Sequence, residues 1–284
     1  MKTKRFLFLL PLIALASCST LGQSINRDRA LEIAEDIEAE EFQLLENSFE
    51  ARINSVSASG KGEEKTSSNS SVYIAYNVLD AEKGESELIY KVNQKVVADG
   101  ETTTSSLAVY IAKDKETSTD DNTYYMGYAM SKKDDEDAEY KSAYESDDPT
   151  RFAAIQSMSM GALSAASAIS SYLDPAALLK SFSDDEDALK EAGIGINYYS
   201  SGSKNLAVKY EYKIPKESAE AYEDDQEYTK TSSLVVEYSN ARFTKMETTS
   251  TTSFNNKSNA KYTINYKSSL KVSMPKGWDN YLED

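Results

Sequence analysis

The 284-residue chain contains no histidine and only one cysteine, Cys18. Without histidine it has neither Ser-His-Asp nor Cys-His nucleophilic machinery, and it has no histidine-bound zinc or other histidine-based metal site. A single cysteine excludes an intramolecular disulfide, so a hydrophobic core must stabilise the fold. Chemistry based on carboxylate, lysine, tyrosine or serine alone stays open, but we expect a non-catalytic protein without a cofactor or a metal.

Positive charge is also scarce in this chain. Lysine and arginine number 31 against 47 aspartate and glutamate residues, which gives a net charge of −16. Nucleic-acid binding requires a basic patch, so we expect no nucleic-acid partner. The same balance predicts no attraction to anionic lipid headgroups. Attachment to a membrane would therefore need an interaction other than electrostatic attraction.

The N-terminus has the organisation of a signal peptide. An apolar run at residues 6–16 follows three basic residues and is of signal-peptide length. A membrane-spanning helix needs roughly 20 apolar residues, so this run is too short to cross a bilayer. The run ends in an aliphatic residue, two small residues and the cysteine: Leu15, Ala16, Ser17 and Cys18.

This ending resembles the lipobox of bacterial lipoprotein signals. The resemblance implies a signal peptide at residues 1–17, a diacylglyceryl group on the sulfur of Cys18, and an extracytoplasmic protein anchored to the cell membrane, or to an outer membrane, by acyl chains. A lipidated tether at residues 18–26 would follow, and its segment 19–24 spans at most about 20 Å. The alternative is an ordinary secretory signal with a chance cysteine.

The rest of the chain alternates between helical and strand patterns. Residues 27–49 have apolar side chains at helical spacing, and residues 57–71 are predicted to form a loop. Period-two alternation then predicts antiparallel strands, because short separators favour hairpins. The predicted strands are residues 72–78, 87–95, 103–113, 123–131, 138–146, 194–200, 205–214, 228–239, 241–254 and 259–274.

The middle of the chain has a different composition. Residues 152–173 carry no charge and are rich in Ala, Ser, Met and Gly, which predicts a largely buried helix rather than a membrane span. A short helix should follow at residues 175–182. The run Ser183-Asp184-Asp185-Glu186 predicts a capping box before a helical turn at residues 188–192. We therefore expect one α+β domain at residues 27–284.

Acidic runs and one short motif suggest chemistry only weakly. The runs at residues 120–122, 134–137 and 184–187 lack the alternating acids and central glycine of an EF-hand loop, so solvated turns are favoured over calcium sites. Ser268 and Lys271 match S-x-x-K, but the motif lies in a strand pattern without its companion motifs.

The 20 tyrosines are the most informative side chains. Many alternate along strands, which favours cross-strand packing. A second interpretation is a cavity for an apolar ligand with a polar head, because tyrosine offers both an apolar ring and a hydroxyl, and methionine adapts its shape. Candidate ligand-binding residues are Tyr124, Met126, Tyr128, Met130, Phe152, Ile155, Leu163, Leu206, Val208, Tyr210 and Tyr212.

The order of helix, strands, small-residue insert and longer strands, together with the lipobox, resembles the half-barrel lipoproteins of the LppX/LprG group and the carriers LolA and LolB. The resemblance implies a curved antiparallel sheet, with the N-terminal helix and a central helical insert packed on its concave face and an apolar ligand such as a lipid between them. The expected function is binding or carrying an amphiphile as a monomer. The alternative is a structural or protein-interaction lipoprotein of the cell envelope without a ligand cavity.

Overall fold

A computed structural model describes residues 21–38, 44–60, 65–83, 85–119, 123–134, 140–146, 172–214, 229–253 and 255–282. Cys18 and residues 147–171, which include most of the predicted insert, lie outside these ranges. No helix among the described residues is long and apolar enough to cross a membrane.

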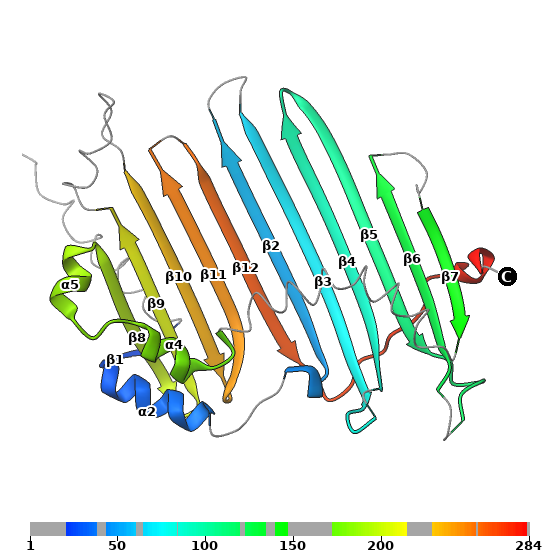
Figure 1. Cartoon of the computed structure of the whole chain (residues 1–284), viewed down its shortest axis with the longest axis horizontal. Coiled ribbons are helices and arrows are strands. Elements are labelled where there is room, and N and C mark those ends of the chain that lie inside the picture. Colours follow the sequence, from blue (N-terminus) through cyan, green and yellow to red (C-terminus); the bar gives the residue numbers. More distant parts are fainter. Residues whose placement is uncertain are drawn as a thin grey trace, which may run out of the picture.

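All described strands belong to one open, curved antiparallel sheet (Figure 1). From one edge to the other the strands are β1 (Gln23–Ile25), β8 (Ile194–Gly202), β9 (Asn205–Lys213), β10 (Lys230–Ser239), β11 (Arg242–Thr252), β12 (Lys257–Tyr266), β2 (Phe49–Ser59), β3 (Thr66–Asp80), β4 (Glu85–Ala98), β5 (Glu101–Lys113), β6 (Tyr125–Lys133) and β7 (Tyr140–Ser146). The helical segments are α2 (Arg27–Glu38), η1 (Leu44–Glu46), α4 (Pro175–Ser181), α5 (Glu186–Glu191) and η4 (Trp278–Tyr281).

Hairpins build the two halves of the sheet. β2 to β7 follow one another in sequence, as do β8 to β12, and the halves join where β12 pairs with β2. Asp99 and Gly100 turn between β4 and β5 with φ of 53° and 78°, as a two-residue turn with left-handed geometry requires. The predicted antiparallel pairing of neighbouring strands is therefore confirmed.

The prediction for residues 27–71 was wrong in two places. The described part of α2 ends at Glu38, and Phe49, which was assigned to the same helix, begins β2. The region predicted as a loop at residues 57–71 contains the end of β2 and the beginning of β3, which pair from Phe49↔Tyr76 to Ser59↔Thr66. Serines occupy the inner-facing positions there, so apolar alternation does not mark these strands.

Two further boundaries differ from the sequence prediction. The N-cap of α5 is Asp185, whose Oδ1 accepts from the backbone N–H of Ala188 at 2.9 Å, rather than Ser183. Strand β12 ends at Tyr266, so the predicted strand end at residue 274 was wrong. The helix at α4 begins at Pro175 as expected, with Asp174 as its N-cap.

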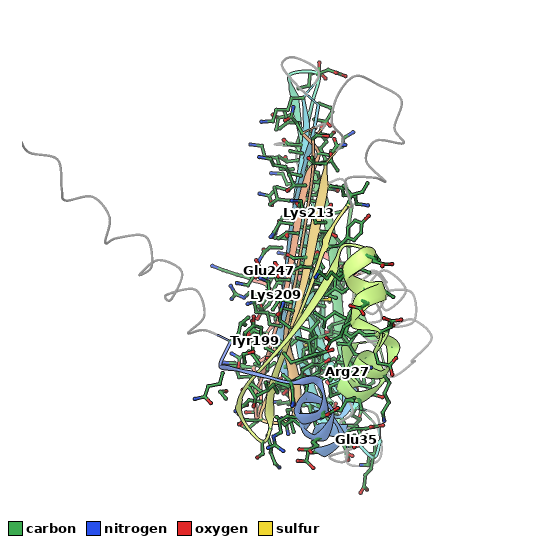
Figure 2. The ribbon with its side chains drawn as sticks, turned by 90° about the vertical axis from the view of Figure 1, so that its left-hand side faces the viewer. Arg27, Glu35, Tyr199, Lys209, Lys213 and Glu247 are labelled. Carbon is green, nitrogen blue, oxygen red and sulfur yellow. The ribbon has the colours of Figure 1, made fainter. Side chains whose placement is uncertain are left out.

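The strand register defines two faces of the sheet. The inner face carries Phe49, Ile74 and Val208, and the outer face carries Arg52 and Lys209. Figure 2 shows the helices, with Arg27 and Glu35, on the side opposite to Lys209 and Glu247. α2 packs against α4, β8 and β9, so the described helices cover one flank of the inner face.

Polarity changes halfway along the inner face. In β2 to β5, the last apolar row crosses Ile53, Val72, Val92 and Leu107. The next inner-facing row consists of Ser55, Ser70, Gln94 and Ser105. In β2 to β5 the inner face is therefore apolar near η1 and rich in hydroxyl and amide side chains toward the other end, whereas on β10 and β9 the Ser55 row carries Leu234 and Tyr210.

Residues 267–282, which we call the strap, cross the lower end of the outer face after β12 (Figure 1). The backbone N–H of Leu270 donates to Oδ1 of Asn77 at 2.9 Å. The ring of Tyr281 lies 6.2 Å from that of Tyr128, and Leu282 forms a parallel bridge with Ala143 of β7. The strap thus connects the centre of the sheet with its far edge.

Asn77 forms the centre of a buried polar network beneath the strap. Its side chain is 5% exposed. Its Nδ2 donates to Oε2 of Glu87 at 2.8 Å, and its Oδ1 also accepts from the hydroxyl of Ser48 at 3.3 Å. The other oxygen of Glu87 accepts from the backbone N–H of Lys113 at 3.1 Å. The network therefore links four strand regions to the strap.

Candidate functional site

The lower inner face has a continuous layer of apolar and tyrosine side chains, which we call the apolar layer. Val109 is 0% exposed, Ala129 1% and Val236 1%, so its centre is fully desolvated. Hydrophobic and aromatic surface of this extent is typical of a core or of a binding site for an apolar ligand. The layer comprises Phe49, Ala51, Ile53, Val72, Ile74, Tyr76, Leu88, Tyr90, Val92, Leu107, Val109, Ile111, Tyr125, Ala129, Leu206, Val208, Val236, Tyr238, Phe243, Met246, Tyr262, Ile264 and Tyr266.

The tyrosines of the apolar layer place polar groups at defined points within it. The hydroxyl of Tyr238 donates to the carbonyl of Tyr172 at 2.7 Å, and that of Tyr266 donates to the carbonyl of Phe243 at 2.8 Å. Burial raises the pKa of Tyr238, Tyr266 and Tyr90 above the usual value for a phenol. These phenols therefore stay protonated to higher pH than a free tyrosine, and Tyr238 and Tyr266 remain hydrogen-bond donors.

Replacement of Tyr266 tests one of these hydrogen bonds. We expect Tyr266→Phe to lower the free energy of unfolding by about 1 kcal/mol at neutral pH, because the carbonyl of Phe243 loses its donor. In the wild type, tyrosines of the unfolded chain ionise above about pH 10 while Tyr266 stays protonated in the folded state. Stability should therefore fall as the pH rises past that value, and fall less in the variant.

Urea unfolding at neutral and alkaline pH measures both effects. Tyr199→Phe is the matched control, because Tyr199 lies on the outer face and is only partly buried. Equal changes in the two variants would contradict a specific role for the Tyr266 hydroxyl.

The structure separates the candidate ligand-binding residues into two sets. Leu206, Val208, Tyr210 and Tyr212 of β9 lie on the inner face, as a set that could contact a ligand there. The β6 residues pair with the outer-facing positions of β5, as in Ala112↔Met126, Tyr110↔Tyr128 and Ala108↔Met130. Candidates outside the described residues are Cys18, Phe152, Ile155 and Leu163.

The prediction that these β6 residues belong to a site on the inner face was therefore wrong, because they lie on the outer face. Met126, Tyr128 and Met130 share the side of the sheet that the strap crosses, and Tyr128 is 5% exposed beside Tyr281. Tyr124 precedes β6 and its backbone pairs with Asp114 and Ser118. The inner face of β6 is formed by Tyr125, Gly127 and Ala129, the last of which belongs to the apolar layer.

Sequence reasoning missed the apolar-layer residues of β2 to β5 as site candidates. Their signal was present as alternation, for example in Val72, Ile74 and Tyr76. What was lacking was the register, which shows that these positions face the same side as β9. The candidate site is therefore centred on the apolar layer rather than on the tyrosines and methionines of β6.

Three shallow grooves also occur among the described residues. One of about 380 Å³ lies on the outer face of β3 to β6, with Asn93, Lys95 and Lys132 among its lining residues. Another of about 400 Å³ is lined mainly by serines at the polar end of β2, β3 and β12. The third, of about 370 Å³, lies between β8, α5 and Arg27.

Among the described residues, ionisable groups form local pairs rather than a metal-binding cluster. Hydrogen bonds from Thr123 and Lys113 lower the pKa of Glu85, and a bond from Thr117 lowers that of Asp114. No group of three or more Asp, Glu, Cys or His side chains suited to a metal is found in the described part of the chain. The acidic run at residues 184–187 instead supplies the N-cap of α5.

Comparisons with known proteins add no relatives. No protein-family model matches the chain, and no curated protein matches it significantly.

Proposed function

We propose that this protein is a membrane-anchored, extracytoplasmic lipoprotein that is non-catalytic and binds or carries a hydrophobic or amphiphilic ligand, such as a lipid, against the apolar layer. The lipobox at residues 15–18 supports the anchor. The apolar layer supports the ligand class, because an acyl chain needs a wide apolar surface and its head a few polar groups.

The observation that carries this proposal is the division of the inner face in β2 to β5. Apolar rows end at Ile53 and Val72, and hydroxyl-bearing rows begin directly beyond them at Ser55 and Ser70. A surface with this division offers one end to a tail and the other to a polar headgroup. In the finer form of the proposal, the half-barrel is completed by the insert at residues 152–173, which would lie over the apolar layer with the ligand beneath it.

Native mass spectrometry of the protein purified in mild detergent tests this function. We expect additional mass from a bound amphiphile, and loss of that mass when Val109, at the fully buried centre of the layer, is changed by Val109→Trp. Val56→Trp is the matched control, since Val56 is 48% exposed on the outer face. No bound or bindable amphiphile in the wild-type protein would contradict the proposal.

The complete burial of Val109, Phe243 and Leu179 favours a second candidate, a structural or interaction lipoprotein in which the chain itself fills this space. In that case Val109→Trp would overpack the core and cost about 1–3 kcal/mol of stability without any ligand to lose. The two candidates are thus separated by whether the substitution removes bound mass.

A further inference from the structure

Lysine and arginine side chains are concentrated on the outer face although the chain is strongly acidic. In the central pair β2 and β12, every charged side chain lies on that face. The outer-face cations of the described strands are Arg52, Lys91, Lys95, Lys132, Lys209, Lys213, Lys245, Lys257 and Lys261. The outer-face carboxylates of the described strands are Glu50, Glu87, Glu145, Glu211, Glu237 and Glu247, and Asp134, directly after β6, lines the outer-face groove with Lys95 and Lys132.

Most of these carboxylates already have partners. Lys245 lies 2.6 Å from Glu237 and 3.6 Å from Glu247, and Lys209 lies 2.9 Å from Glu211. Glu50 accepts from the hydroxyl of Tyr73 at 2.9 Å, and Glu87 belongs to the Asn77 network. The outer-face cations without an ion pair in the described part of the chain are Arg52, Lys91, Lys95, Lys132, Lys213, Lys257 and Lys261.

Two of the unpaired cations lie over tyrosine rings. The guanidinium of Arg52 is 5.5 Å from the ring centre of Tyr73, and Nζ of Lys91 is 5.2 Å from that of Tyr110. Tyrosine is favoured at membrane interfaces because its ring is apolar and its hydroxyl is polar. The outer face therefore combines excess positive charge with an interfacial side chain.

The strap extends the basic surface to the lower end of the sheet. Lys267, Lys271 and Lys276 are all exposed, and none of them has an ion pair among the described residues. The carboxylate in the described part of the strap is that of Asp279. The strap thus adds to the positive surplus of the face that it crosses.

The first described strand, β1, begins on the same side. Figure 2 shows the start of β1 on the side that carries Tyr199 and Lys209, opposite to the helices. Residues 18–22 separate the lipobox cysteine from Gln23, and five residues extend at most about 17 Å. An acyl group on Cys18 would hold this edge of the outer face close to the bilayer.

We propose that the outer face lies against the anionic headgroup surface of the bilayer in which the acyl chains are inserted. This inference rests on the proposed membrane anchoring, but it concerns orientation and electrostatics rather than the ligand. The acidic helices lie on the opposite side of the sheet, and salt screens charges beyond a Debye length of about 10 Å. The local surplus on the outer face, rather than the net charge of −16, then determines the attraction to anionic lipids.

Vesicle co-sedimentation of the unlipidated protein tests this docking surface. The mature chain with Cys18→Ser is mixed with vesicles of phosphatidylglycerol and phosphatidylcholine, or of phosphatidylcholine alone, at low and high salt. The test variant combines Lys95→Glu, Lys257→Glu and Lys261→Glu, all at exposed outer-face positions. The control carries the same charge change at exposed positions on the inner face and on α5, as Lys133→Glu, Lys190→Glu and Lys230→Glu.

We expect binding to the anionic vesicles alone, and loss of that binding at high salt. The outer-face variant should bind about tenfold more weakly or less, and the control should stay within about twofold of the unsubstituted chain. Absence of binding by the unsubstituted chain, or an equal loss in both variants, would overturn the proposal. This assay involves neither the acyl chains nor a bound amphiphile. A negative result would therefore contradict the docking surface but not the acyl anchor or the ligand, which are tested separately.

Discussion

Replacing Asn77 by alanine is expected to lower the free energy of unfolding by about 3 kcal/mol. The substitution removes the donor to Oε2 of Glu87 and leaves a carboxylate that is 5% exposed without that hydrogen bond. It also removes the acceptor for the backbone N–H of Leu270 and for the hydroxyl of Ser48. An unpaired buried polar group costs more than the average hydrogen bond contributes, which is why a large effect is expected.

Urea unfolding followed by circular dichroism measures this loss, and the fluorescence of Trp278 reports on the strap. Trp278 is the single tryptophan and lies half-buried in η4, so release of the strap should shift its emission to the red. Asn54→Ala is the matched control, because Asn54 is exposed on the outer face of β2 and should change stability by less than about 0.5 kcal/mol. Similar losses in the two variants would show that the network does not stabilise the fold.

Replacing Cys18 by alanine is expected to move almost all of the protein from the membrane to the soluble fraction. The acyl groups implied by the lipobox would have no sulfur to attach to, and stable anchoring requires more than one acyl chain or a chain plus a basic surface. The outer face alone should give weak binding that salt removes. Cell fractionation with a high-salt wash, followed by immunoblotting, measures the distribution.

Thr20→Ala is the control for this experiment, since it changes a small polar residue shortly after the lipobox and keeps all four lipobox positions. This variant should remain in the washed membranes. Retention of the Cys18→Ala protein after the same wash would contradict acyl anchoring and, with it, the proposed location.

Strand prediction from this sequence depends on which half of a strand is read. The alternation at Val72, Ile74 and Tyr76 marks β3 correctly, because these residues face the apolar layer. The preceding half of β3 and the second half of β2 present mainly serines to the inner face, so they resemble a loop. Hydrogen bonding to neighbouring strands extends both strands through these polar stretches, and composition does not report such pairing.

Prediction of the candidate site from the sequence failed because the strand register was unknown, not because the residue types were misleading. Period-two spacing shows that Met126, Tyr128 and Met130 share a face, but a shift of one position exchanges the two faces. The face is fixed by the pairing of β6 with β5, through contacts such as Tyr110↔Tyr128. The β9 residues were placed on the inner side by the same rule, and they do adjoin the apolar layer.

The net charge alone also could not predict how the protein interacts with anionic surfaces. A value of −16 predicts repulsion from anionic surfaces only if the charges are evenly distributed. Strand alternation instead places Arg52, Lys95 and Lys261 on one face, while acids such as Glu35 lie with the helices on the other (Figure 2). Charge segregation of this kind becomes visible only when the strands are paired.

The bridge between Ala143 and Leu282 has a consequence for solubility. An open sheet ends in edge strands whose free N–H and C=O groups can pair with another molecule. On one side the edge is β1, which has only three residues. On the other, the last residues of the strap lie along β7. Removal of these residues would expose that edge, so we expect the end of the strap to keep β7 from pairing with the sheet of another molecule.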